Sequence, residues 1–268
     1  MLGQDLVSAY AGHHVTGLGS RDADLRSSQA VLQAVQEARA DCIILASAYA
    51  DVDGCEANPE KAFAVNRDGA ANVARAAAQT GAHLFFISSD YVFDGEKHTP
   101  YETEDSRNPI NVYGRSKAEA ERQLLKIAPQ CCIVRTSWLF GLGGKCFPDT
   151  MLRLARTQPE FRVVNDQRGC PTHTADLARA LAELTRQQAS GIVHATNRGS
   201  CSWFEFARAI LAAQSPQTTV LPVSTAEFPR PAKRPAYSVL SCRSLSEHGI
   251  ELPTWEDALV SYLHLRNK

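Results

Sequence analysis

The clearest chemical signal in this sequence is a tyrosine and a lysine four residues apart. Tyr113 and Lys117 are separated by Gly114, Arg115 and Ser116. On a helix this spacing places both side chains on one face. A cation held beside a phenol favours the phenolate and brings its pKa, about 10 when unperturbed, closer to neutral pH. The pair therefore predicts a general acid that could protonate a developing alkoxide.

Two apolar segments end in residues that could serve the same reaction. Residues 85–95 run from an apolar stretch into two serines and Asp90, and open parallel sheets bind ligands at this carboxyl edge. Ser89 could polarise a substrate carbonyl, although a serine here could also be an ordinary turn residue. Residues 46–53 offer small side chains that let a cofactor approach the backbone. In that segment Tyr49 could equally pack, and Asp53 could be a solvated loop charge.

The elements that would position these groups alternate between short apolar runs and Ala-rich stretches of helical periodicity. This alternation predicts the α/β class, with a parallel sheet covered by helices. Strands are expected at 15–18, 42–46, 83–88, 131–136, 161–164 and 192–195. Helices are expected at 28–38, 59–80, 113–128, 175–187 and 202–213. The stretch 221–235 is dense in proline and charge, so we expect an irregular surface segment there.

Composition favours a small-molecule ligand. The 268 residues are 44% hydrophobic, enough to bury the core of one domain or of one domain plus a lobe. Lys and Arg total 28 against 29 acidic residues, so the balance gives no reason to expect a nucleic acid or a membrane as partner. The eight cysteines show no paired spacing and are interpreted as reduced thiols, and no signal peptide is recognisable. We therefore expect a cytoplasmic protein, and no metal site.

The motifs together resemble the dTDP-4-dehydrorhamnose reductase family of the extended short-chain dehydrogenases/reductases. The resemblance rests on residues 87–95, 113–117, 135–141 and 164–172, and it covers nearly the whole chain. It implies a Rossmann-like doubly wound parallel sheet with a smaller C-terminal lobe. The implied division is an NADP-binding domain at 1–144 and a substrate-binding lobe at 145–268, with about 160–195 returning to the sheet.

The family reduces the 4-keto group of dTDP-4-dehydro-L-rhamnose to dTDP-L-rhamnose, usually with NADPH. Carried over by position, the resemblance makes Ser89 a catalytic hydroxyl, Tyr113 the proton donor, and Lys117 the residue that binds the nicotinamide ribose and tunes Tyr113. The implied contacts of the cofactor are Asp24, Leu25, Ala46, Ala48 and Tyr49. The implied contacts of the nucleotide sugar are Val52, Asp90 and Trp138, with Gln167 and Arg234 for the sugar or the diphosphate. Trp138 could instead be core.

The beginning of the chain departs from the family pattern, which opens with a strand and a glycine-rich turn. Residues 1–6 resemble the end of that turn entering its helix, so Gly3 and Gln4 are expected at the cofactor pyrophosphate. Because the missing strand would be central, we expect a natural chain that starts further upstream. In the chain as given, we expect unpaired backbone groups and exposed apolar side chains beside the gap, with weak NADPH binding.

Several alternatives stay open. Arg21 could meet a 2′-phosphate, but the preference for NADPH over NADH rests mostly on the resemblance. The family more often has Asn at Tyr237 and Asp at Ser241, so the substrate could be another dTDP-4-keto-6-deoxysugar. A non-catalytic regulatory subunit, similar to that of methionine adenosyltransferase, is a further alternative. A nucleotide-sugar dehydratase is disfavoured, because its usual Asp-Glu pair is replaced by Asp90 and Tyr91. A homodimer is compatible with the resemblance, since family members differ in assembly.

Overall fold

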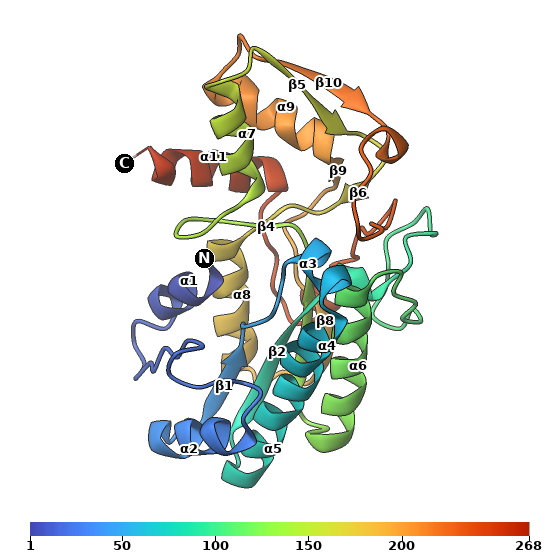
Figure 1. The fold of residues 1–268 in the computed structure, drawn as a ribbon. Coiled ribbons are helices and arrows are strands. Elements are labelled where there is room, and N and C mark those ends of the chain that lie inside the picture. Colours follow the sequence, from blue (N-terminus) through green and yellow to red (C-terminus); the bar gives the residue numbers. More distant parts are fainter. Residues whose placement is uncertain (268) are drawn as a thin grey trace.

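A parallel four-stranded sheet lies at the centre of the larger part of the molecule (Figure 1). The structure is a computed structural model that describes residues 1–267. The strand order is β1-β2-β3-β8, and every neighbouring pair is parallel. These strands are β1 (Cys42–Leu45), β2 (His83–Ser89), β3 (Cys132–Thr136) and β8 (Gly191–His194). The register pairs Ser89 with Thr136, so β2 and β3 end side by side. The α/β class with a parallel sheet is confirmed.

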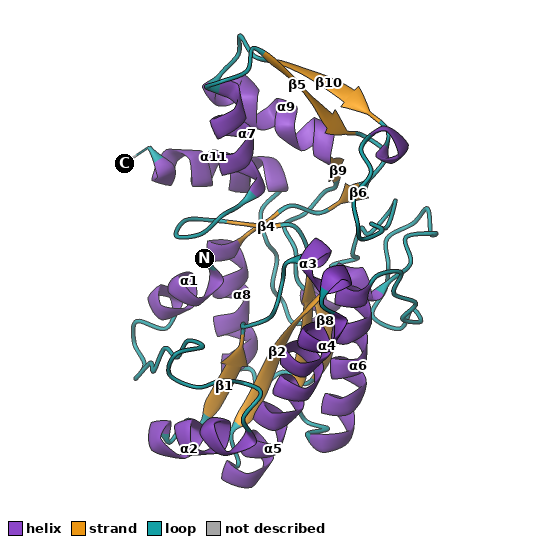
Figure 2. Ribbon diagram, in the orientation of Figure 1, coloured by secondary structure: helices purple, strands orange, loops and turns teal. Residues whose placement is uncertain are grey.

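Helices cover both faces of this sheet, as Figure 2 shows. Successive side chains of a strand point to opposite faces, and β2 divides its residues accordingly. Leu84 and Phe86 pack with the helices α2 (Ser28–Ala38), α5 (Ala70–Thr80) and α6 (Val112–Ile127). Phe85 and Ile87 pack with α1 (Leu2–Ala9), α8 (Thr174–Arg186) and α10 (Arg243–Glu247) on the other face. The result is a doubly wound core.

A separate apolar cluster holds together the upper part of the molecule in Figure 1. It packs α7 (Phe147–Ala155), α9 (Trp203–Gln214) and α11 (Trp255–Arg266) against β5 (Glu160–Val164). Strand β5 pairs in parallel with β10 (Thr219–Val223). The short strands between the two parts are β4 (Leu139–Phe140), β6 (Arg168–Gly169), β7 (Thr172–His173) and β9 (Cys201–Ser202).

Most expected helices and strands are confirmed, and the exceptions have physical reasons. The helix expected at 59–80 is divided into α4 (Pro59–Phe63), a π-helical segment η1 (Ala64–Gly69) and α5. The π segment turns Asn66 toward the loop after β1, where its side chain bonds both backbone groups of Tyr49. Such insertions are typical of functional regions of helices.

Three predictions about strands were wrong or incomplete. No strand forms at 15–18, where Val15 and Leu18 are 41% and 48% exposed. The strand expected at 161–164 forms as β5, but it pairs with β10 and not with the central sheet. Part of the stretch expected to be irregular is β10, which is followed by the 3-10 helix η3 (Thr225–Glu227).

Strand β1 is an edge of the central sheet, since within residues 1–267 it pairs only with β2. Its residues Cys42, Ile43 and Ile44 are only half-buried. The exposed apolar side chains expected in this region are found at Val15 and Leu18, whereas these three side chains of β1 stay half-buried.

Burial also governs the cysteines, all eight of which are free thiols. It raises the pKa of seven of them, namely Cys42, Cys55, Cys131, Cys132, Cys146, Cys170 and Cys201. As for membranes, no helix within residues 1–267 has both the length and the apolar character needed to cross a bilayer.

Candidate active site

The carboxyl end of β2 carries a chain of hydrogen-bonded hydroxyl and carboxyl groups. Ser89 Oγ donates to Asp90 Oδ1 at 2.9 Å and accepts from the Tyr91 N–H at 3.2 Å. Ser238, from a segment 148 residues further along the chain, donates to the other oxygen of Asp90 at 2.6 Å. Asp90 begins the 3-10 helix η2 (Asp90–Val92), which turns the backbone away from the sheet edge. Ser89 and Asp90 are thereby fixed at the edge where ligands bind to open sheets.

Asp90 has an unusual environment for a carboxyl group, because it is only 2% exposed and no cation pairs with it among the described residues. Burial disfavours the charged form, whereas the two hydroxyl donors favour it. Burial is the larger effect and raises the pKa of Asp90 to about 7. The group therefore changes its protonation state near neutral pH.

Helix α6 brings the tyrosine and the lysine to the same edge. Asn111 caps the helix by accepting from the Gly114 N–H at 2.7 Å. A Cβ at Gly114 would lie 2.0 Å from the carbonyl oxygen of Tyr91, so only glycine allows this approach of α6 to η2. The Tyr91 and Tyr113 rings meet edge to face with centroids 5.9 Å apart. Ser89 lies close enough to Tyr113 to lower its pKa.

The expectation that Lys117 lowers the pKa of Tyr113 was wrong for this arrangement. Burial raises the pKa of Tyr113, and the main opposing effect is the Ser89 hydroxyl. Lys117 Nζ instead donates to the Ile87 carbonyl at 2.5 Å and lies 4.0 Å from the centre of the Phe86 ring. The phenol thus keeps its proton at neutral pH, which is the state that a proton donor needs before the reaction.

Lys117 is itself a perturbed group. It is 1% exposed, and burial lowers its pKa to about 7, while the negative charge of Glu121 opposes that shift. Glu121 lies one further turn along α6, so Tyr113, Lys117 and Glu121 share one face of the helix.

Glu121 anchors this face to both neighbouring strands, a role that sequence reasoning missed. Its carboxylate takes two parallel hydrogen bonds from Arg135 of β3, at 3.0 and 2.7 Å, and one from Ser88 of β2 at 2.5 Å. Arg107 adds a contact at 3.1 Å. Glu121 and Arg135 are 0% and 1% exposed, so this is a buried, fully hydrogen-bonded ion pair. The spacing of four residues after Lys117 was the available signal.

Several residues expected at the cofactor lie along the same edge of the sheet. Ala46 and Ala48 follow β1, and Tyr49 is held there by Asn66, which also donates to Ser116 of α6 at 2.9 Å. At the end of β3, Thr136 Oγ1 is buried and has no hydrogen-bond partner among the described residues. A buried polar atom without a partner next to Ser89 fits an edge built to receive a polar ligand.

The remaining cofactor-side residues are distributed over two other places. Asp24 pairs with Arg26 at 2.6 Å, and Leu25 packs against Gly69 and accepts from Asn72. Gly3 and Gln4 lie in the exposed first turn of α1. The Gln4 side chain lies against Gly143 of the loop after β4. No contact joins Gly3 or Gln4 directly to Ser89, Tyr113 or Lys117 in the described hydrogen bonds, so their role at a pyrophosphate stays a prediction.

On the substrate side, Trp138 is held more firmly than its sequence suggested. Its backbone has a φ of +46°, which is unusual for a residue other than glycine. Its indole stacks on that of Trp203 with centroids 3.5 Å apart and planes within 5°, and Gly169 leaves room at its edge. Sequence reasoning did not connect Trp203, at the start of α9, with Trp138, because nothing local links the two residues.

The other residues expected at the substrate lie in three different segments. Val52 begins the short helix α3 (Val52–Ala57) next to the start of α6. Gln167 is 8% exposed and donates to Thr225 at 2.9 Å, so it binds the segment after β10. Arg234 is paired with Asp53 of α3 at 2.5 Å, which corrects the interpretation of Asp53 as a solvated loop charge.

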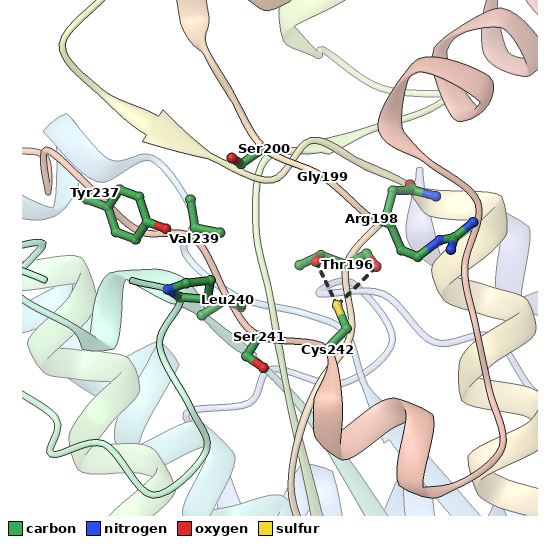
Figure 3. Close-up of a pocket in the computed structure, with 11 residues that line it drawn as sticks. Thr196, Arg198, Gly199, Ser200, Tyr237, Val239, Leu240, Ser241 and Cys242 are labelled. Carbon is green, nitrogen blue, oxygen red and sulfur yellow. Dashed lines mark hydrogen bonds between the residues drawn. The ribbon is translucent and has the colours of Figure 1, made fainter. Parts of the chain in front are cut away.

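One pocket lies away from the catalytic edge. It has a volume of about 390 Å³ and is lined by residues 196–200, residues 237 and 239–242, and Pro100. Figure 3 shows Cys242 in the lining, with its thiol hydrogen-bonded to Thr196. Ser238 from the same segment is not part of the lining, and its hydroxyl reaches Asp90. None of Ser89, Tyr113 and Lys117 lines this pocket, so the chemistry is assigned to the strand ends.

A doubly wound parallel sheet that brings serine, tyrosine and lysine to its carboxyl edge defines an extended short-chain dehydrogenase/reductase, a Rossmann-like oxidoreductase. Within this class, the chain belongs to the family described as the RmlD substrate binding domain, whose model matches residues 1–267. A dTDP-4-dehydrorhamnose reductase of Sinorhizobium fredii is 42% identical over 253 residues, which cover 90% of this chain and 86% of the relative. The spore coat polysaccharide biosynthesis protein SpsK of Bacillus subtilis is 39% identical over 257 residues, with 96% and 90% covered.

Solved structures agree with this assignment. The dTDP-4-dehydrorhamnose reductase of Bacillus anthracis, determined in complex with NADP, is 38% identical and superposes with a TM-score of 0.95 over 98% of this chain and 94% of that one. The orthologue from Clostridium acetobutylicum is 37% identical, with a TM-score of 0.97 over 100% and 96% of the two chains. The resemblance inferred from the motifs is confirmed at the level of the family.

Proposed function

We propose that this protein reduces the 4-keto group of dTDP-4-dehydro-L-rhamnose to give dTDP-L-rhamnose, with NADPH as the reductant. The observation that carries the proposal is the convergence of three residues at one edge of the sheet. Ser89 ends β2, and Tyr113 and Lys117 lie in the first two turns of α6. Membership in the reductase family and the NADP found in the Bacillus anthracis relative support the substrate and the cofactor.

Each residue has a defined task in this proposal. When bound, NADPH supplies the hydride that attacks the carbonyl carbon. Ser89 orients the carbonyl oxygen by hydrogen bonding and aligns it with Tyr113. Tyr113 gives its phenolic proton to the oxygen as negative charge develops there, and Lys117 would bind the ribose of the cofactor. Tyr49, Ala46 and Ala48 would border the cofactor, with Asp24 and Leu25 toward its adenine and Gly3 and Gln4 toward its pyrophosphate.

The test is reduction of the keto sugar by the purified protein, followed as loss of NADPH absorbance, with the product identified by NMR. Tyr113→Phe should lose about 10² to 10⁴ in kcat, the range that one general acid supplies. Tyr10→Phe is a matched control, because Tyr10 is bonded to Thr185 of α8 and lies outside the site. Near-normal turnover by Tyr113→Phe would refute the assignment of Tyr113 as the proton donor.

The same assay separates the alternatives. Reduction of a different dTDP-4-keto-6-deoxysugar in preference to this one would keep the chemistry and change the substrate. A protein that binds nucleotide, reduces no keto sugar and copurifies with another enzyme would be a regulatory subunit. Comparing NADPH with NADH gives the cofactor preference. A protein with this function would work in the cytoplasm. Its assembly is proposed to be a homodimer, which sedimentation would test.

A further inference from the structure

One carboxylate organises the segment that returns from the upper lobe to the catalytic edge. Asp53 Oδ2 accepts from Nε and Nη2 of Arg230 at 2.9 and 2.5 Å. Its Oδ1 accepts from Arg234 Nη1 at 2.5 Å and from the Ala232 N–H at 3.1 Å. Four donors from residues 230–234 therefore converge on one side chain of α3, which lies 177 to 181 residues earlier in the chain.

The segment carries more positive charge than Asp53 neutralises. Arg230, Lys233 and Arg234 are cationic, and within residues 1–267 the only carboxylate in an ion pair with them is Asp53. Arg234 Nη1 donates one hydrogen bond to Asp53 at 2.5 Å and one to the Ala232 carbonyl at 2.6 Å. A guanidinium has five donors, so both arginines keep N–H groups for a further acceptor. The excess charge and the free donors fit an anionic ligand with several oxygens.

Arg234 and its neighbour Lys233 connect the segment to the aromatic residues and the helix of the catalytic edge. Arg234 lies close enough to the Tyr91 phenol to lower its pKa against the rise caused by burial, and Tyr91 contacts the ring of Tyr113. The neighbouring Lys233 carbonyl accepts from Asn111 Nδ2 at 2.8 Å, and Asn111 is the cap of α6. The segment is thus fixed both to α3 and to the helix that carries the proton donor.

We propose that Asp53 is a positioning residue for the diphosphate of the nucleotide sugar, because it holds Arg230 and Arg234 in fixed orientations beside the catalytic edge. The inference rests on the proposed function, which supplies a nucleoside diphosphate as the substrate class. Asp53 acts through the arginines and does not touch the substrate. Ordering two long side chains in advance removes an entropic cost that binding would otherwise carry.

A simple effect of charge has the opposite sign, which makes the proposal testable. A carboxylate near a diphosphate repels it, so removal of the negative charge alone should strengthen binding. If Asp53 orders the arginines, its removal should weaken binding despite the gain in positive charge. Asp51 provides a matched control, since it is an exposed carboxylate two residues away that caps α3 and pairs with no arginine in the described structure.

The experiment measures calorimetric binding of dTDP and dTMP to the full-length protein and to the Asp53→Asn and Asp51→Asn variants. We expect the dTDP dissociation constant to rise about tenfold in Asp53→Asn, the loss expected from two freed side chains, and to change less than about twofold in Asp51→Asn. The change for dTMP should be smaller, because it lacks the second phosphate. Asp53→Asn made in an Arg230→Ala background should have a smaller effect than in the wild type, because one of its two arginine partners is already absent while Arg234 remains.

Unchanged or tighter dTDP binding by Asp53→Asn would overturn the positioning role of Asp53. An equal loss of affinity for dTDP and dTMP would overturn it as well. If Asp53→Asn does not fold, Arg230→Ala tests the same pair, because Arg230 is 52% exposed and its removal leaves the core intact. It should weaken dTDP binding by a similar factor, and wild-type affinity would count against the proposal. A wild-type protein without reductase activity would instead overturn the proposed function. Because the binding measurements need no turnover, the two failures can be told apart.

Discussion

The raised pKa of Asp90 makes a quantitative prediction about the pH dependence of stability. The pKa of this buried carboxyl rises from 3.8 to about 7 in the folded protein. Each unit is worth about 1.4 kcal/mol, so ionisation of Asp90 in the folded state costs about 4 kcal/mol. The folded state therefore holds the proton of Asp90 more tightly than the unfolded state does, and this difference stabilises the folded protein. Because the folded pKa is raised, the stabilisation is fully present below about pH 4 and is lost as the pH rises through about 7. Between about pH 5 and about pH 8 the loss is roughly 2.5 kcal/mol.

The perturbation is Asp90→Asn, which keeps the shape of the side chain and removes the titration. Urea unfolding of both proteins at several pH values between about 5 and about 8 gives the free energy of unfolding at each pH. We expect wild-type stability to fall relative to the variant across this range by roughly 2.5 kcal/mol. The other ionisable groups are common to both proteins and cancel in the comparison. A constant offset between the two proteins at every pH would refute the reasoning.

Ser238→Ala is the companion variant. Its hydroxyl donates to Asp90 and lowers the pKa of the carboxyl, against the larger effect of burial. Removing that donor should move the pH at which stability is lost to a higher value. A shift toward lower pH would mean that the hydroxyl does not stabilise the carboxylate.

Three further substitutions test the framework around the site. Trp203→Ala removes the ring on which Trp138 stacks and should raise the KM for the nucleotide sugar about tenfold with a smaller change in kcat, measured by steady-state kinetics. Glu121→Gln leaves Arg135 buried without its anionic partner and should lower the free energy of urea unfolding by about 3 to 5 kcal/mol. Gly114→Ala forces a Cβ against a backbone carbonyl and should cost about 1 to 3 kcal/mol together with most of the activity.

The features that sequence predicted well depend on short stretches of chain. The tyrosine and lysine lie on one helical face because their spacing is fixed by α6 itself. The alternation of apolar runs with helical patterns predicted the parallel sheet, since each strand carries its own signal. Ser89 was placed correctly at the sheet edge because a strand and the turn after it determine where its last residue lies.

What sequence did not predict depends on contacts between distant segments. Asp53 and Arg230 are 177 residues apart, and neither has a local feature that indicates the other. Strand β5 was assigned to the central sheet because its composition does not say which strand it pairs with. The effect of Lys117 on Tyr113 was misjudged for a related reason. Spacing fixes a shared face, but the carbonyl of Ile87 determines where the ammonium points.

The burial of most of the thiols has a practical consequence for measuring motion in this protein. The thiolate is the reactive form, so cysteines whose pKa is raised by burial react slowly with alkylating dyes. A cysteine introduced at an exposed position such as Val260 of α11, which is 67% exposed, should therefore label selectively once the half-buried Cys242, which lines the pocket, is replaced by serine. A second label on α2 would then let fluorescence energy transfer follow the upper lobe relative to the sheet as nucleotides bind.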